Sequence, residues 1–185
     1  MGMHTYSPQD QRFHFAAWAA GRAYGRGGKG LSVPAAINGL SKPEIKKLAN
    51  GLQELPKSRD DFDAAHDQWC QMVVKSFGPG LTYGRAAKLV NVYLKALFLP
   101  DFGREAVDDP VQTELLFRTN FIHPPIDRIL LDTLAKADTS NAKAWRELCS
   151  LGWTRFDQLQ YHDVIKLITK KTSGELWRIE EYWTP

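Results

Sequence analysis

The sequence has few cysteines and no long apolar run. Its 185 residues include only Cys70 and Cys149, and neither belongs to a Cys-x-x-Cys pair. Two isolated cysteines do not make a disulfide framework, so we expect buried thiols in a reducing compartment, the cytoplasm. No apolar run approaches the length of about 20 residues that spans a bilayer, and residues 1–15 lack the layout of a signal peptide. We therefore expect a cytoplasmic protein without a membrane partner.

The sequence also lacks the strict alternation of apolar and polar residues that is typical of strands. Apolar residues instead recur at spacings of three and four, and no segment repeats at a fixed period. Hydrophobic residues make up 43% of the chain, which is ordinary for a globular protein. These observations predict an all-α fold, with residues 1–185 forming a single compact domain of about eight short helices.

Helix start and stop signals divide the chain. Ser7, Thr82 and Thr154 each precede a helical pattern as N-cap residues, and Ser41 opens a capping box with Glu44. The expected helices lie at 8–24, 41–51, 60–77, 83–98, 124–137, 141–150, 155–171 and 174–183. The intervening residues 99–126 are expected to form a long, mostly irregular connection.

Charge is distributed unevenly along the chain. Residues 1–100 hold 13 Lys and Arg against 7 Asp and Glu, whereas residues 101–185 hold 11 against 14. The segment 12–59 is the most basic, with nine cations and only two acidic residues. Such clustering suits a face that contacts phosphates, and a solvated surface without a partner is the alternative.

The expected helix at 83–98 has one polar stripe on an otherwise apolar surface. Arg85, Lys88, Asn91 and Lys95 fall within an arc of about 120° when residues are placed at 100° intervals. A largely buried helix that keeps three cations on one stripe presents them to a ligand, so we expect this stripe to be exposed. A solvated stripe without a ligand is the alternative.

The turn before this helix has the features of a phosphate site. Gly80 and Gly84 allow the backbone to approach a partner closely, and Thr82 caps the helix whose N–H groups follow. We predict that Gly80, Thr82, Gly84, Arg85 and Lys95 contact nucleic acid. A simple corner between two helices is the alternative.

An acidic residue begins the expected helix at 124–137. The diproline at 124–125 leads into the helix and places Asp127 in its first turn. Asp127 lies within about 40° of Leu131 and about 20° of Leu134 on the helical wheel, so its carboxylate follows an apolar face. A poorly solvated carboxylate suits a base or a cation stabiliser, whereas a plain helix cap is the alternative.

Together these features resemble the helix-hairpin-helix (HhH-GPD) DNA glycosylase superfamily, nearest in style to its archaeal 8-oxoguanine branch. The resemblance covers residues 60–137 and rests on the glycine-containing turn, the helix AAKLVNVYLK and Pro125-Ile126-Asp127. It implies a hairpin whose amides hold a DNA phosphate, Asp127 as the catalytic carboxylate, and Lys88 near the position of the family's lyase lysine. Three residues separate Gly80 from Gly84, where the family signature has one.

The resemblance implies excision of a damaged or modified base from duplex DNA after the base is flipped into a pocket. Candidate pocket residues adjoin the motifs: Trp18, Tyr83, Phe121 and His123. We expect a monomer that needs no cofactor and no metal. Repair of host DNA and defence against viral DNA are both open.

Two further functions are consistent with the sequence. Arg118 and His123 give an Arg-x4-His spacing that resembles the catalytic motif of HEPN ribonucleases, which are also all-α. A helical DNA-binding protein without catalysis is the other alternative. A glycosylase depends on Asp127, the ribonuclease on Arg118 and His123, and a binder on none of them.

Overall fold

The computed structural model describes residues 6–24, 32–106 and 108–184, and all regular structure in these ranges is helical. The α-helices are α1 (Pro8–Tyr24), α2 (Val33–Leu40), α3 (Pro43–Lys46), α4 (Arg59–Phe77), α5 (Tyr83–Phe98), α6 (Pro110–Phe117), α7 (Arg128–Ala137), α8 (Ala142–Leu151) and α9 (Gln158–Lys171). The 3₁₀ helices are η1 (Lys47–Asn50), η2 (Leu52–Glu54), η3 (Leu99–Asp101), η4 (Arg118–Phe121), η5 (Thr139–Asn141), η6 (Trp153–Arg155) and η7 (Leu176–Tyr182). The predicted all-α class is confirmed. None of the described helices is long and apolar enough to cross a membrane.

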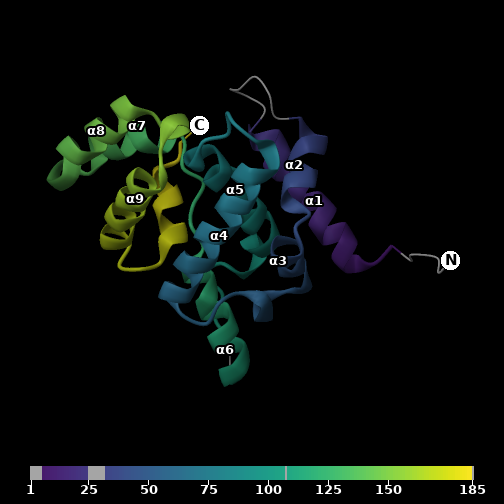
Figure 1. Cartoon of the computed structure of the whole chain (residues 1–185). Coiled ribbons are helices and arrows are strands. Elements are labelled where there is room, and N and C mark those ends of the chain that lie inside the picture. Colours follow the sequence, from purple (N-terminus) through teal and green to yellow (C-terminus); the bar gives the residue numbers. More distant parts are fainter. Residues whose placement is uncertain (1–5, 25–31, 107, 185) are drawn as a thin grey trace.

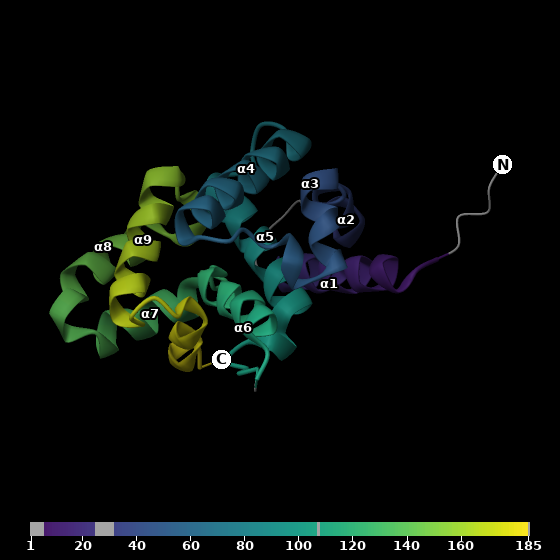
Figure 2. The same ribbon diagram turned by 90° about the horizontal axis from the view of Figure 1, so that it is seen from below.

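Helix α5 is the centre of the structure. It packs against α1, α4, α9 and η6, and eleven of its sixteen residues are buried. In Figures 1 and 2, α1 to α3 lie on one side of α4 and α5, whereas α7 to α9 lie on the other. Because α5 is apolar on nearly every side, it can be enclosed by helices from both halves of the chain.

The predicted caps of two helices are confirmed. The Ser7 hydroxyl accepts a hydrogen bond from the Asp10 amide at 3.1 Å, and α1 runs to Tyr24. The Thr82 hydroxyl accepts from the Arg85 amide at 3.4 Å and donates to the Thr154 carbonyl at 2.7 Å. Thr82 therefore starts α5 and also ties that start to a segment 72 residues later.

The predicted capping box at Ser41 is wrong. Ser41 ends α2, and its hydroxyl donates to the Ile37 carbonyl at 2.6 Å. The helix α2 was not expected, although Ser32 caps it by accepting from the Ala35 amide at 3.3 Å. The hydroxyl that the sequence pattern assigned to the following helix is therefore used by the preceding one.

Two other boundaries differ from the prediction. The connection at 99–126 contains α6, which Asp109 caps by accepting from two backbone amides at 3.0 Å. Helix α9 begins after Asp157, which forms a capping box with Gln160. The predicted cap of this helix, Thr154, is wrong, since Thr154 lies within η6. Cys70 is fully buried, Cys149 is partly buried, and both are free thiols.

Gly84 is a point of close contact between α5 and η6. A Cβ atom at Gly84 would lie 2.1 Å from the Trp153 carbonyl oxygen, whereas at Gly21 the nearest atoms would lie at 3.1 Å. Replacement of a helical glycine by alanine gains about 1 kcal/mol of helix propensity. We expect Gly84→Ala to lower the free energy of unfolding by about 1–3 kcal/mol because of the clash, and Gly21→Ala to change it by less than about 1 kcal/mol. Urea unfolding measures both, and equal stability of the two variants would contradict the close packing.

Candidate functional site

A mostly buried ion pair joins α5 to the start of α7. The Lys88 ammonium lies 3.2 Å from Oδ2 of Asp127, and the two side chains are only 11% and 16% exposed. Asp127 is the N-cap of α7 rather than a first-turn residue, because its backbone is extended and its Oδ1 accepts from the Leu130 amide at 3.1 Å. The two residues predicted to be catalytic, 39 positions apart in the sequence, are therefore in direct contact.

Two tryptophans flank this ion pair. The Lys88 ammonium lies 4.6 Å from the centre of the Trp153 ring, at η6. The Trp183 indole Nε1, just after η7, donates to Asp127 Oδ2 at 3.1 Å, and 40% of the Trp183 surface is exposed. Sequence reasoning missed both residues, because neither lies near Lys88 or Asp127 in the chain. The arrangement gives a carboxylate with an amine on one side and aromatic surface around it.

The predicted exposure of the cationic stripe on α5 is wrong for Lys88, which is only 9% exposed. Lys95 forms an ion pair with Glu180 of η7, and burial lowers the pKa of the Lys95 ammonium. Arg85 is half-buried, and its buried Nε has no described hydrogen-bond partner. Acidic groups from α7 and η7 pack over the stripe, so it is largely an internal interface rather than an open face.

The turn before α5 is only partly open. The Gly84 amide donates to the Phe156 carbonyl at 3.0 Å, so this N–H is already used within the protein. Gly80 lies at the exposed tip with a left-handed φ of 124°, and a Cβ atom there would meet no atom within 4 Å. Of the predicted phosphate contacts in this turn, Gly80 is exposed, Thr82 is half-buried with its hydroxyl bonded to Thr154, and Gly84 is buried.

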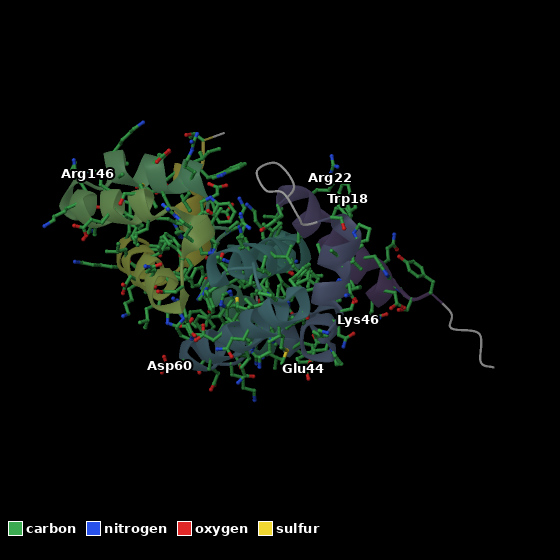
Figure 3. The ribbon with its side chains drawn as sticks, turned by 45° about the horizontal axis from the view of Figure 1, so that its top comes forward. Trp18, Arg22, Glu44, Lys46, Asp60 and Arg146 are labelled. Atoms are coloured by element: carbon green, nitrogen blue, oxygen red, sulfur yellow. The ribbon has the colours of Figure 1, made fainter. Side chains whose placement is uncertain are left out.

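The four predicted base-pocket residues make their described contacts in three different places. Tyr83 and His123 both pack against Tyr161, with ring centres 5.5 and 5.8 Å from it. Phe121 packs against Phe117 at 5.4 Å, and Trp18 lies on the outer surface of α1, 48% exposed (Figure 3). The structure therefore does not bring the four together around Lys88 and Asp127.

A buried hydrogen-bond network fixes the segment that leads to Asp127. Asn91 of α5 donates to the Pro124 carbonyl and to the Tyr161 hydroxyl, both at 2.8 Å, and accepts from His66 at 2.7 Å. The Tyr161 hydroxyl then donates to Nδ1 of His123 at 3.0 Å. Burial raises the pKa of Tyr161 and lowers that of His66, so both side chains stay neutral in this network.

The tautomer of His123 follows from its partners. Its Nε2 lies 2.9 Å from Oδ1 of Asp63, and a carboxylate only accepts, so Nε2 carries the proton and Nδ1 accepts from Tyr161. Burial lowers the pKa of His123. Burial alone would raise the pKa of Asp63. The hydrogen bond from His123 and the charge of Arg59 together lower this pKa by more, so it lies below the usual value.

The predicted ribonuclease pair is held by separate partners. Arg118 is buried and donates to the Leu55 carbonyl at 2.9 Å and to Glu114 at 2.7 Å. His123 is bonded to Asp63 and Tyr161 as described above. In the part of the chain that the structure describes, no hydrogen bond connects Arg118 with His123.

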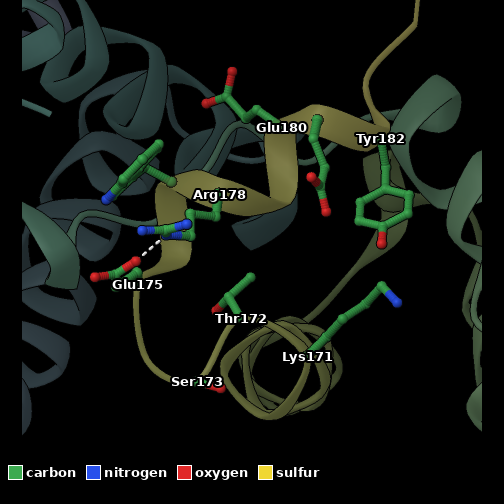
Figure 4. A pocket seen from close by; sticks show the side chains of 9 residues that line it. Lys171, Thr172, Ser173, Glu175, Arg178, Glu180 and Tyr182 are labelled. Atoms are coloured by element: carbon green, nitrogen blue, oxygen red, sulfur yellow. Dashed lines mark hydrogen bonds and ion pairs between the residues drawn. The ribbon is translucent and has the colours of Figure 1, made fainter. Parts of the chain in front are cut away.

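A cavity of about 700 Å³ lies between the end of α9 and η7. Figure 4 shows side chains of both signs at its edge, including Lys171 and Glu175. The Lys171 ammonium is 4.7 Å from the Tyr182 ring, and Glu175 pairs with Arg178. The two cationic groups of its described lining, Lys171 and Arg178, therefore already have partners within the protein.

No protein-family model, curated protein or solved structure matches the chain. Membership of the glycosylase superfamily therefore stays a prediction that rests on the sequence motifs. Lys88, Asp127, Trp153 and Trp183 are the residues that the fold brings together at the candidate site.

The ion pair predicts strong energetic coupling between its two members. Removal of one partner leaves the other charge poorly solvated, so Lys88→Met and Asp127→Asn should each destabilise the protein by roughly 3 kcal/mol. We expect the double variant to be more stable than the sum of the two losses predicts, with a coupling energy of about 0.5–3 kcal/mol. Urea unfolding of the four proteins measures this coupling. Strict additivity would show that the two side chains do not interact in solution.

Proposed function

We propose that this protein is a DNA glycosylase that releases a damaged or modified base. The observation that carries the proposal is the contact between Lys88 and Asp127 in a partly dehydrated site. The two residues come from the helix and the helix start to which the family resemblance assigns catalytic groups. An amine and a carboxylate side by side are the groups that this reaction needs.

Asp127 has the properties of a group that stabilises developing positive charge. Breaking the bond between base and deoxyribose builds oxocarbenium character on the sugar, which a nearby carboxylate stabilises. The Leu130 amide fixes one Asp127 oxygen, so the carboxylate needs little reorientation during the reaction. Its low exposure strengthens the interaction because water screens it less.

Lys88 is placed to act as a nucleophile or as a proton donor. A neutral Lys88 amine can attack C1′ of the deoxyribose while the base leaves with the bond electrons. The proton that Lys88 loses passes to the Asp127 carboxylate, 3.2 Å away, and from there to the departing base, so Asp127 is ionised again beside the cationic sugar adduct. Without such an attack, Asp127 would instead activate a water molecule.

Trp153 and Trp183 supply aromatic surface next to these groups. A flipped base is commonly held by stacking on aromatic side chains. In the free protein the Trp183 indole is bonded to Asp127, so Trp183 has to move before a sugar can reach the carboxylate. We assign Trp153 to stacking on the flipped base and Trp183 to covering Asp127 in the free protein.

The Asp127→Asn variant tests the proposed chemistry. Asparagine keeps the helix cap but removes the charge, so DNA binding should persist while base release falls about 100-fold or more. DNAs with oxidised, alkylated, deaminated and phage-type modified bases serve as substrates, and abasic sites are scored. Asp132→Asn, at a more exposed carboxylate of α7, is the matched control and should retain full activity.

Three outcomes would contradict the proposal. A stable Asp127→Asn protein with the wild-type rate of base release would remove Asp127 from the mechanism. Cleavage of RNA that depends on His123, without abasic sites in any DNA, would favour the ribonuclease. Salt-sensitive DNA binding without any base release would favour the non-catalytic binding protein.

The Lys88→Met variant tests the nucleophile. Attack by Lys88 gives an amine adduct at C1′, and this adduct becomes a protonated imine when the C1′–O4′ bond opens and one proton moves from the nitrogen to O4′. Borohydride reduces the imine to a stable covalent complex. We expect borohydride to trap wild-type protein on DNA that contains the base it releases. The Lys88→Met variant should not be trapped on the same DNA. Lys75→Met, at an exposed lysine of α4, is the control and should be trapped normally. Base release without trapping of wild-type protein would assign the attack to water.

A further inference from the structure

A groove lies between α4 and α9, apart from the Lys88–Asp127 site. Its volume is about 440 Å³, within the range of small-molecule sites. It is lined by Arg59, Asp63, His123, His162, Ile165, Lys166, Thr169 and Lys170. None of these residues contacts Lys88 or Asp127 in the described structure, and His123, which the sequence analysis expected in the base pocket, lines this groove instead.

One wall of the groove is a polar stripe of α9. His162, Lys166 and Lys170 follow one another at spacings of four residues and therefore share one helix face. Both lysines are exposed. Lys166 has only a loose ion pair with Asp163, at 3.7 Å, and no described carboxylate lies within ion-pair distance of Lys170. The Nε2 of His162 is bonded to Asp67 at 2.8 Å.

The opposite wall is formed by α4, and its Arg59 guanidinium is held by hydrogen bonds to both walls. Arg59 donates from Nε to both oxygens of Asp63, at 3.1 and 3.2 Å, and from Nη2 to Thr169 at 2.9 Å. The last bond connects α4 with α9, so the two walls are held at a set separation. Asp63 also accepts from the buried His123.

The charges of the groove do not cancel. Arg59 balances Asp63, which is the acidic residue of the lining, and His123 is kept neutral by burial. Lys166 and Lys170 remain in excess, with Asp163 as the partial counter-charge of Lys166. A concave, cationic surface with fixed hydrogen-bonding groups favours an anion of several oxygens.

We infer that the groove between α4 and α9 binds a phosphoryl group, supplied either by the backbone of a nucleic acid or by a free nucleotide. Lys166 and Lys170 provide the charge, and the Arg59–Thr169 bond holds the walls in place. Lysine binds phosphate as a point charge and needs no rigid geometry, which suits two lysines at the rim.

The double variant Lys166→Gln/Lys170→Gln tests this site. Both lysines are exposed, so the variant should fold as the wild type does. The control is Lys136→Gln/Lys143→Gln, which removes the same charge from exposed positions of α7 and α8. The probes are pyrophosphate, a deoxynucleoside monophosphate and a fluorescently labelled DNA duplex.

Each source of the phosphoryl group has its own result. If it is the DNA backbone, the groove variant should bind the duplex at least tenfold more weakly than the control, and the slope of log K against log salt should fall by about 2. If it is a nucleotide, the monophosphate should raise the melting temperature of wild type and control but not of the groove variant. Either result supports the inference.

The inference is overturned if the groove variant and the control respond equally to all three probes. This result would leave the proposed glycosylase untouched, because base release depends on Asp127 rather than on the groove. Conversely, loss of base release in Asp127→Asn should leave the response to the probes unchanged. The two proposals therefore fail independently.

Discussion

The arrangement of both sites depends on one buried side-chain amide, that of Asn91. It bonds His66 of α4, Tyr161 of α9 and the backbone carbonyl of Pro124, and all three bonds are 2.7–2.8 Å long. These partners come from parts of the chain that are otherwise far apart in sequence. Each donor has an acceptor, so the network brings polar groups into the core without leaving them unpaired. Loss of this one amide would take a hydrogen-bond partner from three buried groups, of which Tyr161 would keep its bond to His123, and such losses are costly in a low-dielectric interior.

The same network connects the two candidate sites. Its bond to Pro124 fixes the segment that ends at Asp127, whereas its continuation through Tyr161 reaches His123 and Asp63 in the groove. His123 and Asp127 stand four residues apart in the chain, on either side of the diproline. The stiff diproline segment therefore holds a carboxylate at one site and an imidazole at the other.

Local signals in the sequence predicted the helices better than they predicted the site. Caps and apolar spacing were sufficient for α1 and α5, and apolar spacing placed α4 although its cap, Ser58, was not predicted, because these signals depend on neighbouring residues. Helices α2 and α6 were missed even though Ser32 and Asp109 cap them, since short helices hold few apolar repeats. The stripe on α5 was correctly recognised as polar, but the pattern of one helix does not reveal which later segment covers it. Trp153 and Trp183 were missed for the same reason, because only the folded chain brings them to Lys88.

The contacts of Lys88 also bear on the order in which the chain folds. Its partners lie at positions 127 and 153, the partner of Lys95 lies at 180, and the indole on Asp127 belongs to position 183. During synthesis, α1 to α5 emerge first, and long-range contacts of this kind form late and slowly. Until the later segments dock, the cations of α5 have none of their acidic partners. An incompletely made chain is therefore more cationic at its core helix than the finished protein, in which the later segments neutralise this charge.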